Sequence, residues 1–135
     1  MIPEPLIALA IEQEQLWYLV WDRAGICQAS YSQALEDFAI YQSYLNNPTR
    51  IETDLRLLIN KYNLKKIVLL IVFDQQQPPL HVRAQYQFLA HTLPVQYLFM
   101  LTSSDARTLQ DSPSAPYPYT QGLYAAAVAL WKGSP

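Results

Sequence analysis

The sequence predicts a single α/β domain over residues 1–135, with a mixed five-stranded sheet of three antiparallel strands followed by two parallel ones, and helices on both faces. Three observations carry this prediction. The first part of the chain reads as three short strands joined by tight turns. Apolar residues then recur at helical spacing, and two β-prone segments alternate with the helices that follow. A length of 135 residues is typical of one domain.

The composition favours a packed core. Hydrophobic residues make up 51% of the chain and charged residues 15%, which excludes wholesale disorder. A domain of this length buries about two-thirds of its unfolded surface. Part of the apolar excess is expected in a subunit interface.

Three strand-like segments open the chain. Leu6–Ile11 is wholly apolar, as a central strand covered on both faces is, and Leu16–Trp21 is aromatic and β-branched. Ile26–Tyr31 is the third. The connections, a polar patch at residues 12–15 and a turn at residues 22–25, are short enough to permit only antiparallel hairpins.

Two helices are predicted next. Ser32 is a suitable N-cap for the first, which Asn46-Asn47-Pro48 ends. Thr49 can cap the second, with Glu52 three residues later completing a capping box, and Asn63 is the expected stop. The apolar face of the second helix contains Ile51, Leu55, Leu58, Ile59 and Tyr62.

The remaining elements alternate between strand and helix. Lys66–Phe73 is predicted as a central parallel strand, and a helix from Leu80 to Thr92 is stopped by Pro94. Val95–Leu101 is the fifth strand, and a polar stretch follows it. The last helix, Gln121–Trp131, is apolar nearly all round and is therefore expected to be buried or shared with a partner.

This order of elements resembles the ribonuclease-H-like superfamily, and within it the RuvC-type Holliday-junction resolvases. The closest local matches are residues 51–73, Leu93-Pro94-Val95 and Leu123–Leu130. The resemblance covers nearly the whole chain, as a pattern more than as identity. It implies the ribonuclease-H-like fold and a metal-dependent endonuclease. Such enzymes hold two divalent ions between carboxylates of the first strand, the fourth strand and the start of the last helix.

The residues at those positions depart from the family's pattern. The corresponding stretches, residues 8–11, 69–72 and 121–124, contain no acid; the nearest carboxylates are Glu12, Asp74 and Asp111. Paired divalent ions need several anionic oxygens around them. We therefore expect the two-metal site to be lost. The alternative is a residual one-metal site of Glu12 and Asp74 at neighbouring strand exits, with Mg²⁺ or Mn²⁺ as the ion.

The charge balance argues modestly against strong DNA binding. The net charge is −2, and the nine basic residues are scattered apart from Lys61, Lys65 and Lys66. Affinity for nucleic acid comes largely from many basic groups that neutralise phosphates. With three glycines in the chain, no phosphate-cradling loop of the P-loop or dinucleotide type is expected.

Aromatic residues supply the candidate binding sites. Tyr117 and Tyr119 belong to a Pro/Tyr-rich segment that either docks a partner, stacks on bases or packs on its own domain. Trp17 and Trp21 lie four apart on one strand, hence on the same face, opposite Tyr18. They form either core or an aromatic contact surface.

Three functions remain after these exclusions. The first is a catalytically degenerate, resolvase-like binding or assembly module, a homo-oligomer or the partner of another protein, with no cofactor. The alternative is a divergent endonuclease using Glu12, Asp74 and Asp111 with Mg²⁺ or Mn²⁺. A small-ligand pocket near the strand ends is a third possibility. The basic start of a signal peptide and an apolar run long enough for a bilayer are both missing, so we expect a cytoplasmic protein without a membrane partner.

Overall fold

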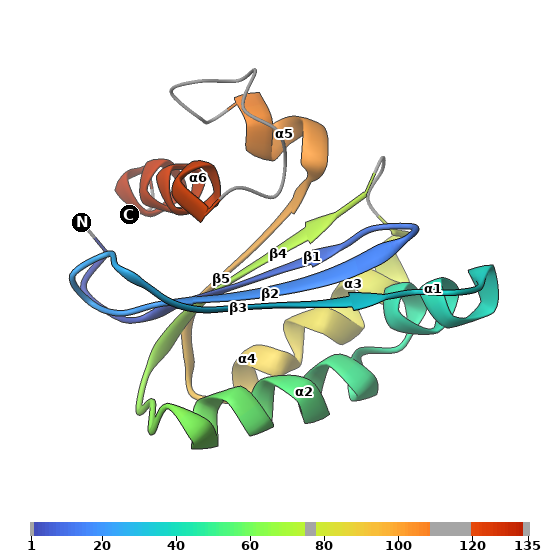
Figure 1. Cartoon of the computed structure of the whole chain (residues 1–135), viewed down its shortest axis with the longest axis horizontal. Helices are drawn as coiled ribbons and strands as arrows, with labels where there is room; N and C mark the ends of the chain where they lie inside the picture. The colour runs from blue at the N-terminus through green and yellow to red at the C-terminus, as the bar shows by residue number, and fades with distance from the viewer. Residues whose placement is uncertain (1, 75–77, 109–119, 134–135) are drawn as a thin grey trace.

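β1 (Leu6–Ile11) is the central strand of a five-stranded sheet in the order β3-β2-β1-β4-β5 (Figure 1). A computed structural model describes residues 2–74, 78–108 and 120–133, and the structural statements concern these residues. β1 pairs with β2 antiparallel and with β4 parallel, so the predicted mixed sheet is confirmed. The other strands are β2 (Gln15–Trp21), β3 (Cys27–Ala34), β4 (Ile67–Phe73) and β5 (Val95–Thr102).

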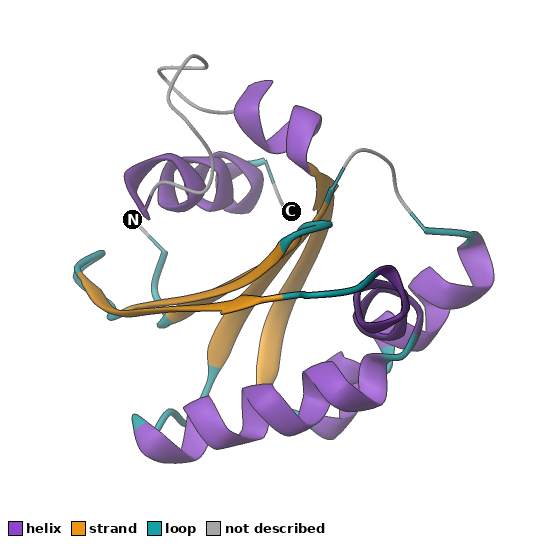
Figure 2. Ribbon diagram, turned by 45° about the vertical axis from the view of Figure 1, so that its right-hand side comes forward, coloured by secondary structure: helices purple, strands orange, loops and turns teal. Residues whose placement is uncertain are grey.

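Helices cover both faces of this sheet, as predicted (Figures 1 and 2). One face carries α1 (Phe38–Asn46), α2 (Pro48–Lys61), α3 (Leu80–Gln87) and α4 (Leu89–Thr92). The other face carries α5 (Ser103–Thr108) and α6 (Thr120–Lys132). None of the described helices has both the length and the apolarity that crossing a bilayer requires.

Strand alternation divides the core into two clusters, one on each side of the sheet. In β1, Ile7, Leu9 and Ile11 join the cluster under α1 to α4, whereas Leu6, Ala8 and Ala10 join the cluster under α6. All seven residues of β4 are likewise buried. A strand covered on both faces has no polar side, which explains why these two segments read as continuous apolar runs.

The start of the first helix differs from the prediction. β3 runs on to Ala34 because Ser32 and Ala34 pair with β2, opposite Trp17 and Gln15. The helix begins at Phe38, and Asp37 is its N-cap, with the carboxylate accepting a hydrogen bond from the Ile40 amide at 2.9 Å. Ser32 is therefore a strand residue and not a helix cap. The local sequence pattern could not reveal this, because the strand partner of Ser32, Trp17, lies 15 positions earlier in the chain.

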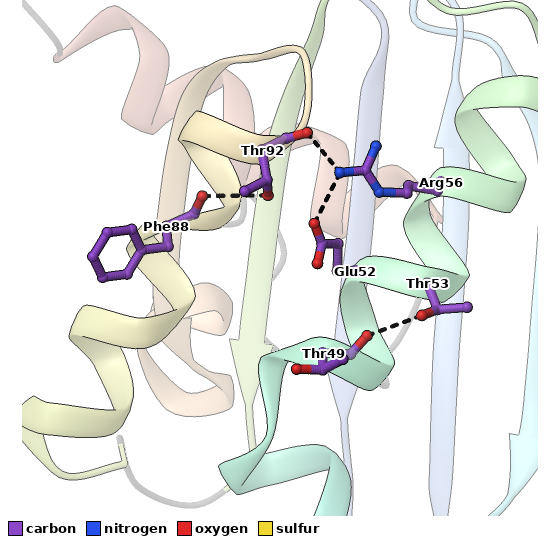
Figure 3. Close-up of polar contacts among 6 residues, drawn as sticks. All are labelled: Thr49, Glu52, Thr53, Arg56, Phe88 and Thr92. Atoms are coloured by element: carbon purple, nitrogen blue, oxygen red, sulfur yellow. Dashed lines mark hydrogen bonds and ion pairs between the residues drawn. The ribbon is translucent and has the colours of Figure 1, made fainter.

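The N-terminus of α2 is also capped by a different residue. Asn47 Oδ1 accepts from the Thr49 amide at 3.0 Å, and Pro48 occupies the first turn. Glu52 completes no capping box. Instead it accepts from Arg56 Nη2 at 2.9 Å, and Arg56 also donates to the Thr92 carbonyl at 2.9 Å, which ties α2 to α4 (Figure 3).

The C-terminus of α2 confirms Asn63 as the stop. Asn63 has a φ of 52°, the left-handed conformation that asparagine tolerates. The Leu64 amide donates to the Ile59 carbonyl at 2.9 Å and the Asn63 amide to the Asn60 carbonyl at 3.3 Å. These two bonds form a Schellman motif and satisfy carbonyls that the helix leaves open.

Two further differences concern the later helices. The helix predicted over residues 80–92 is interrupted at Phe88, which separates α3 from α4. α5, which the sequence did not predict, directly follows β5, and Thr102 Oγ1 accepts from the Asp105 amide at 3.2 Å in its first turn.

Candidate functional site

The carboxyl ends of β1, β4 and β5 meet at one edge of the sheet. Ile11 is in register with Phe73, and Phe73 with Thr102. Glu12 and Asp74, the residues that follow β1 and β4, are consequently neighbours at this edge. The strand order of the fold therefore brings together two acids that lie 62 positions apart in the chain (74 minus 12).

Hydrogen bonds at this edge engage Asp74 in the local backbone. Its amide donates to the Ile11 carbonyl at 3.0 Å, and its Oδ2 accepts from the Gln13 amide at 3.3 Å. The Glu12 amide closes the β1–β2 turn by donating to the Gln15 carbonyl at 3.0 Å. Burial, and then the charge of Asp74, raise the pKa of the Tyr41 hydroxyl. The Asp74 carboxylate thus holds the turn in place beside Tyr41 of α1.

The side chains of β1 and β4 next to these carboxyl ends are apolar. On the α6 side, β1 and β4 present Ala10 and Val72, and both are buried. Within residues 2–74, 78–108 and 120–133, no three His, Cys, Asp or Glu side chains form a group that could hold a metal ion. Glu12 and Asp74 are the acids that directly follow β1 and β4, and two carboxylates are fewer than a pair of divalent ions requires.

The last helix supplies no further acid. The sequence from Thr120 to Lys132 contains neither Asp nor Glu, and Leu123, Ala126 and Ala127 of α6 are buried. The other predicted site residues of this region, Asp111, Tyr117 and Tyr119, lie outside the described residues.

Trp17 and Trp21 share one face of β2, the face toward α6, and Tyr18 lies on the opposite face. Trp21 is fully buried, with its ring centroid 5.8 Å from that of Tyr124. Trp17 is partly buried at the rim of the same cluster. Of the two rings, Trp17 is the less buried, although its Nε1 is buried.

A groove with apolar and charged lining, which the sequence did not predict, lies between β3 and α2. Its volume is about 320 Å³, and Tyr18, Tyr31, Asp54 and Lys61 are among its lining residues. The Tyr18 hydroxyl donates to Asp54 Oδ2 at 2.7 Å, and Lys61 Nζ donates to the Tyr31 hydroxyl at 2.7 Å. Helical spacing predicts that Asp54 and Lys61 share a face of α2. Which strand lies opposite that face depends on the tertiary structure.

Comparison with known proteins identifies the fold. No family model and no curated protein sequence matches the chain. Among solved structures, it is similar to Thermus thermophilus RuvC in complex with a Holliday-junction substrate, with a TM-score of 0.55, 8% identity and 97% of each chain covered. It is also similar to MreB 5 of Spiroplasma citri bound to AMPPNP, with a TM-score of 0.53 and 8% identity. That match covers 81% of this chain but 41% of the MreB chain. The chain therefore has the ribonuclease-H-like fold. At 8% sequence identity, the similarity establishes the fold and not the activity.

Proposed function

We propose that this chain is a catalytically degenerate, resolvase-like domain that acts as a binding or assembly module through protein contacts. One observation carries the proposal: among the described residues, Glu12 and Asp74 belong to no group of three side chains that could hold a metal ion, and Asp74 accepts a hydrogen bond from the Gln13 amide. Holding two divalent ions against their mutual repulsion needs more anionic oxygens than this edge supplies.

The test is cleavage of branched DNA in the presence of Mg²⁺ or Mn²⁺, with Thermus thermophilus RuvC as the positive control. We expect RuvC to cut a Holliday junction and this chain to leave it intact. Mn²⁺ should also produce no selective broadening of the amide NMR signals of Glu12 and Asp74. Cleavage that disappears in Asp74→Asn would overturn the proposal.

The alternative function is a divergent metal-dependent endonuclease. The observation that favours it is the neighbouring position of Glu12 and Asp74 at the strand ends. In that case Asp111 would be the third ligand, and Glu12→Gln, Asp74→Asn and Asp111→Asn would each abolish metal-dependent cleavage. A chain that cuts DNA equally well in all three variants would contradict this mechanism too.

Self-association is the assembly that exposed apolar side chains of this domain support. Leu80 at the start of α3 is 74% exposed, and Phe88 at its end is 65% exposed. We expect sedimentation to give a mass above 15.5 kDa, and Phe88→Glu to lower it. Gln87→Glu, an equal change of charge at the adjacent exposed position, is the control. If the protein is a monomer at every concentration, self-association is refuted, and the proposed role is then binding to a different protein.

A further inference from the structure

β3 is an edge strand whose second half lacks the charged residues and prolines that normally protect such an edge; the irregularity of the β2–β3 ladder lies at its other end, beside Val20 and Trp21. Among the described strands it pairs with β2 alone, and its residues from Ser30 to Ala34, apart from the groove side of Tyr31, are well exposed. Its sequence, CQASYSQA, contains no charged residue and no proline. Natural edge strands usually carry lysine, proline or a covering element, because free amides and carbonyls recruit further strands.

The ladder identifies which backbone groups face outward. Leu35, just past β3, donates its amide to the Glu14 carbonyl at 2.8 Å, so that pair is a hydrogen-bonded one. Hydrogen-bonded and non-bonded pairs alternate along antiparallel strands. The amides and carbonyls of Ser30, Ser32 and Ala34 therefore point away from β2, toward the open side of the sheet.

The groove beside this edge combines apolar and charged lining. Tyr31 and Gln33 of β3 face Leu57 and Leu58 of α2 across about 320 Å³. Leu57 is 65% exposed. Figure 1 shows β3 along the edge of the sheet, with α2 running below it. An extended chain added outside β3 would direct alternate side chains into this groove.

Two opposite charges lie along the groove. Asp54 is held by the Tyr18 hydroxyl, and Lys61 is held by the Tyr31 hydroxyl, with Lys61 Nζ 5.0 Å from the Tyr31 ring centroid. Seven residues of helix separate Asp54 from Lys61, or about 10 Å along the axis. Side chains on one face of a strand recur every ~7 Å, so a long basic and a long acidic side chain two positions apart can reach both charges.

We propose that β3 and this groove bind an extended peptide segment of a partner protein, which adds a strand outside β3. A basic side chain of the segment lies over Asp54, and an acidic one lies at Lys61. The inference rests on the proposed function as a protein-binding module and names the class of partner. Strand addition draws affinity from main-chain hydrogen bonds and specificity from pockets for alternate side chains. The Asp54 carboxylate disfavours a nucleic acid, whose phosphates it repels.

The test uses a labelled peptide, Thr-Val-Lys-Val-Glu-Val-Thr with blocked ends, titrated into the full chain. We expect amide NMR shifts on β3 and on the Asp54–Lys61 face of α2, together with a rise in fluorescence anisotropy. Replacing the peptide lysine with glutamate should weaken binding. Shifts on β5 in place of β3, or none at saturating peptide, would refute the proposal.

Matched variants separate the backbone contribution from the charge contribution. Ser32→Pro removes an outward amide and should weaken binding by about tenfold, whereas Ser32→Ala keeps that amide and should not. Lys61→Glu should weaken binding roughly threefold or more, and Lys65→Glu, a charge change at another exposed lysine, should not. Affinity equal to wild type in both Ser32→Pro and Lys61→Glu would overturn the site.

The two proposals fail separately. Loss of the peptide site changes neither the cleavage result nor the Mn²⁺ result at Glu12 and Asp74, because neither residue lines the groove. Metal-dependent cleavage lost in Asp74→Asn would instead overturn the proposed function, whatever the peptide does.

Discussion

Two tyrosines with buried hydroxyls, Tyr86 and Tyr124, differ in whether the hydroxyl has a hydrogen-bond partner. The Tyr86 hydroxyl donates to the carbonyls of Tyr44 and Leu45 at the end of α1, the second at 3.1 Å. The Tyr124 hydroxyl is buried without a hydrogen-bond partner in the described structure. One hydroxyl therefore satisfies open helix carbonyls, and the other carries an uncompensated desolvation cost.

We predict opposite effects of removing these hydroxyls. Tyr86→Phe should lower the free energy of unfolding by about 1–3 kcal/mol, because it removes the hydrogen bond to the buried Tyr44 carbonyl and the one to the partly buried Leu45 carbonyl. Tyr124→Phe should leave it unchanged or raise it, since no bond is lost. Urea unfolding followed by circular dichroism measures both. Equal losses in the two variants would contradict the assignment of these contacts.

Tyr86 and a second buried tyrosine, Tyr18, should make the stability of the fold depend on alkaline pH. Burial raises the pKa of Tyr86, and burial together with the hydrogen bond to Asp54 raises that of Tyr18. The unfolded value is about 10, so the folded state retains these protons where the unfolded state loses them. The stabilisation is complete below pH ~10 and is lost as the pH rises toward the folded values.

Urea midpoints measured at rising pH test this dependence. The free energy of unfolding should fall above pH ~10, by up to ~1.4 kcal/mol per pH unit for each group. Tyr18→Phe should make the decline shallower than in wild type. Parallel curves for the two proteins would show that Tyr18 does not contribute.

At the scale of elements, helix caps depend on where the chain enters the helix. Both Asn47 and Thr49 are chemically suitable N-caps, and a capping-box pattern selected Thr49. In the structure, the Asn47 side chain accepts the bond, whereas the Thr49 carbonyl accepts from Thr53 within the helix at 3.1 Å. Arg56 meanwhile draws Glu52 toward α4, away from the helix start.

We therefore expect Asn47→Ala to lower the free energy of unfolding by about 1 kcal/mol, the usual cost of a lost cap. Thr49→Ala, the matched control, should change it by less than ~0.5 kcal/mol. Chemical denaturation of both variants measures the difference. The reverse order would restore Thr49 as the cap.

At the scale of the whole molecule, the sheet joins two core clusters into one unit. Leu55 of α2 lies in the first cluster and Leu123 of α6 in the second, and both are fully buried. β1 and β4 contribute alternate side chains to both clusters, so neither layer can separate without exposing the same strands.

Leu55→Ala and Leu123→Ala should each lower the free energy of unfolding by about 2–5 kcal/mol. Because the layers share their strands, each variant should still unfold in one transition, coincident by near-UV and far-UV circular dichroism. A second transition in Leu123→Ala would show that α6 and its layer unfold separately from the rest.

The sequence by itself determined the fold class and several features of its elements. Alternation and helical periodicity are local patterns, so they predicted the strand order along the chain, the buried character of β1 and β4, and the stop at Asn63. The composition of the last helix, which contains no acid, can also be read directly from residues 120–132.

Tertiary structure alone decided the contacts between distant segments. The extension of β3 to Ala34 and the groove between Tyr31 and Lys61 depend on strand order and register. The register of β1 with β4 places Glu12 beside Asp74, as the sequence predicted from neighbouring strand exits. These contacts join residues that are 15 or more positions apart in the chain. Local propensity describes a segment's own backbone and which of its faces is apolar, whereas the identity of the neighbour is set by how the whole chain packs.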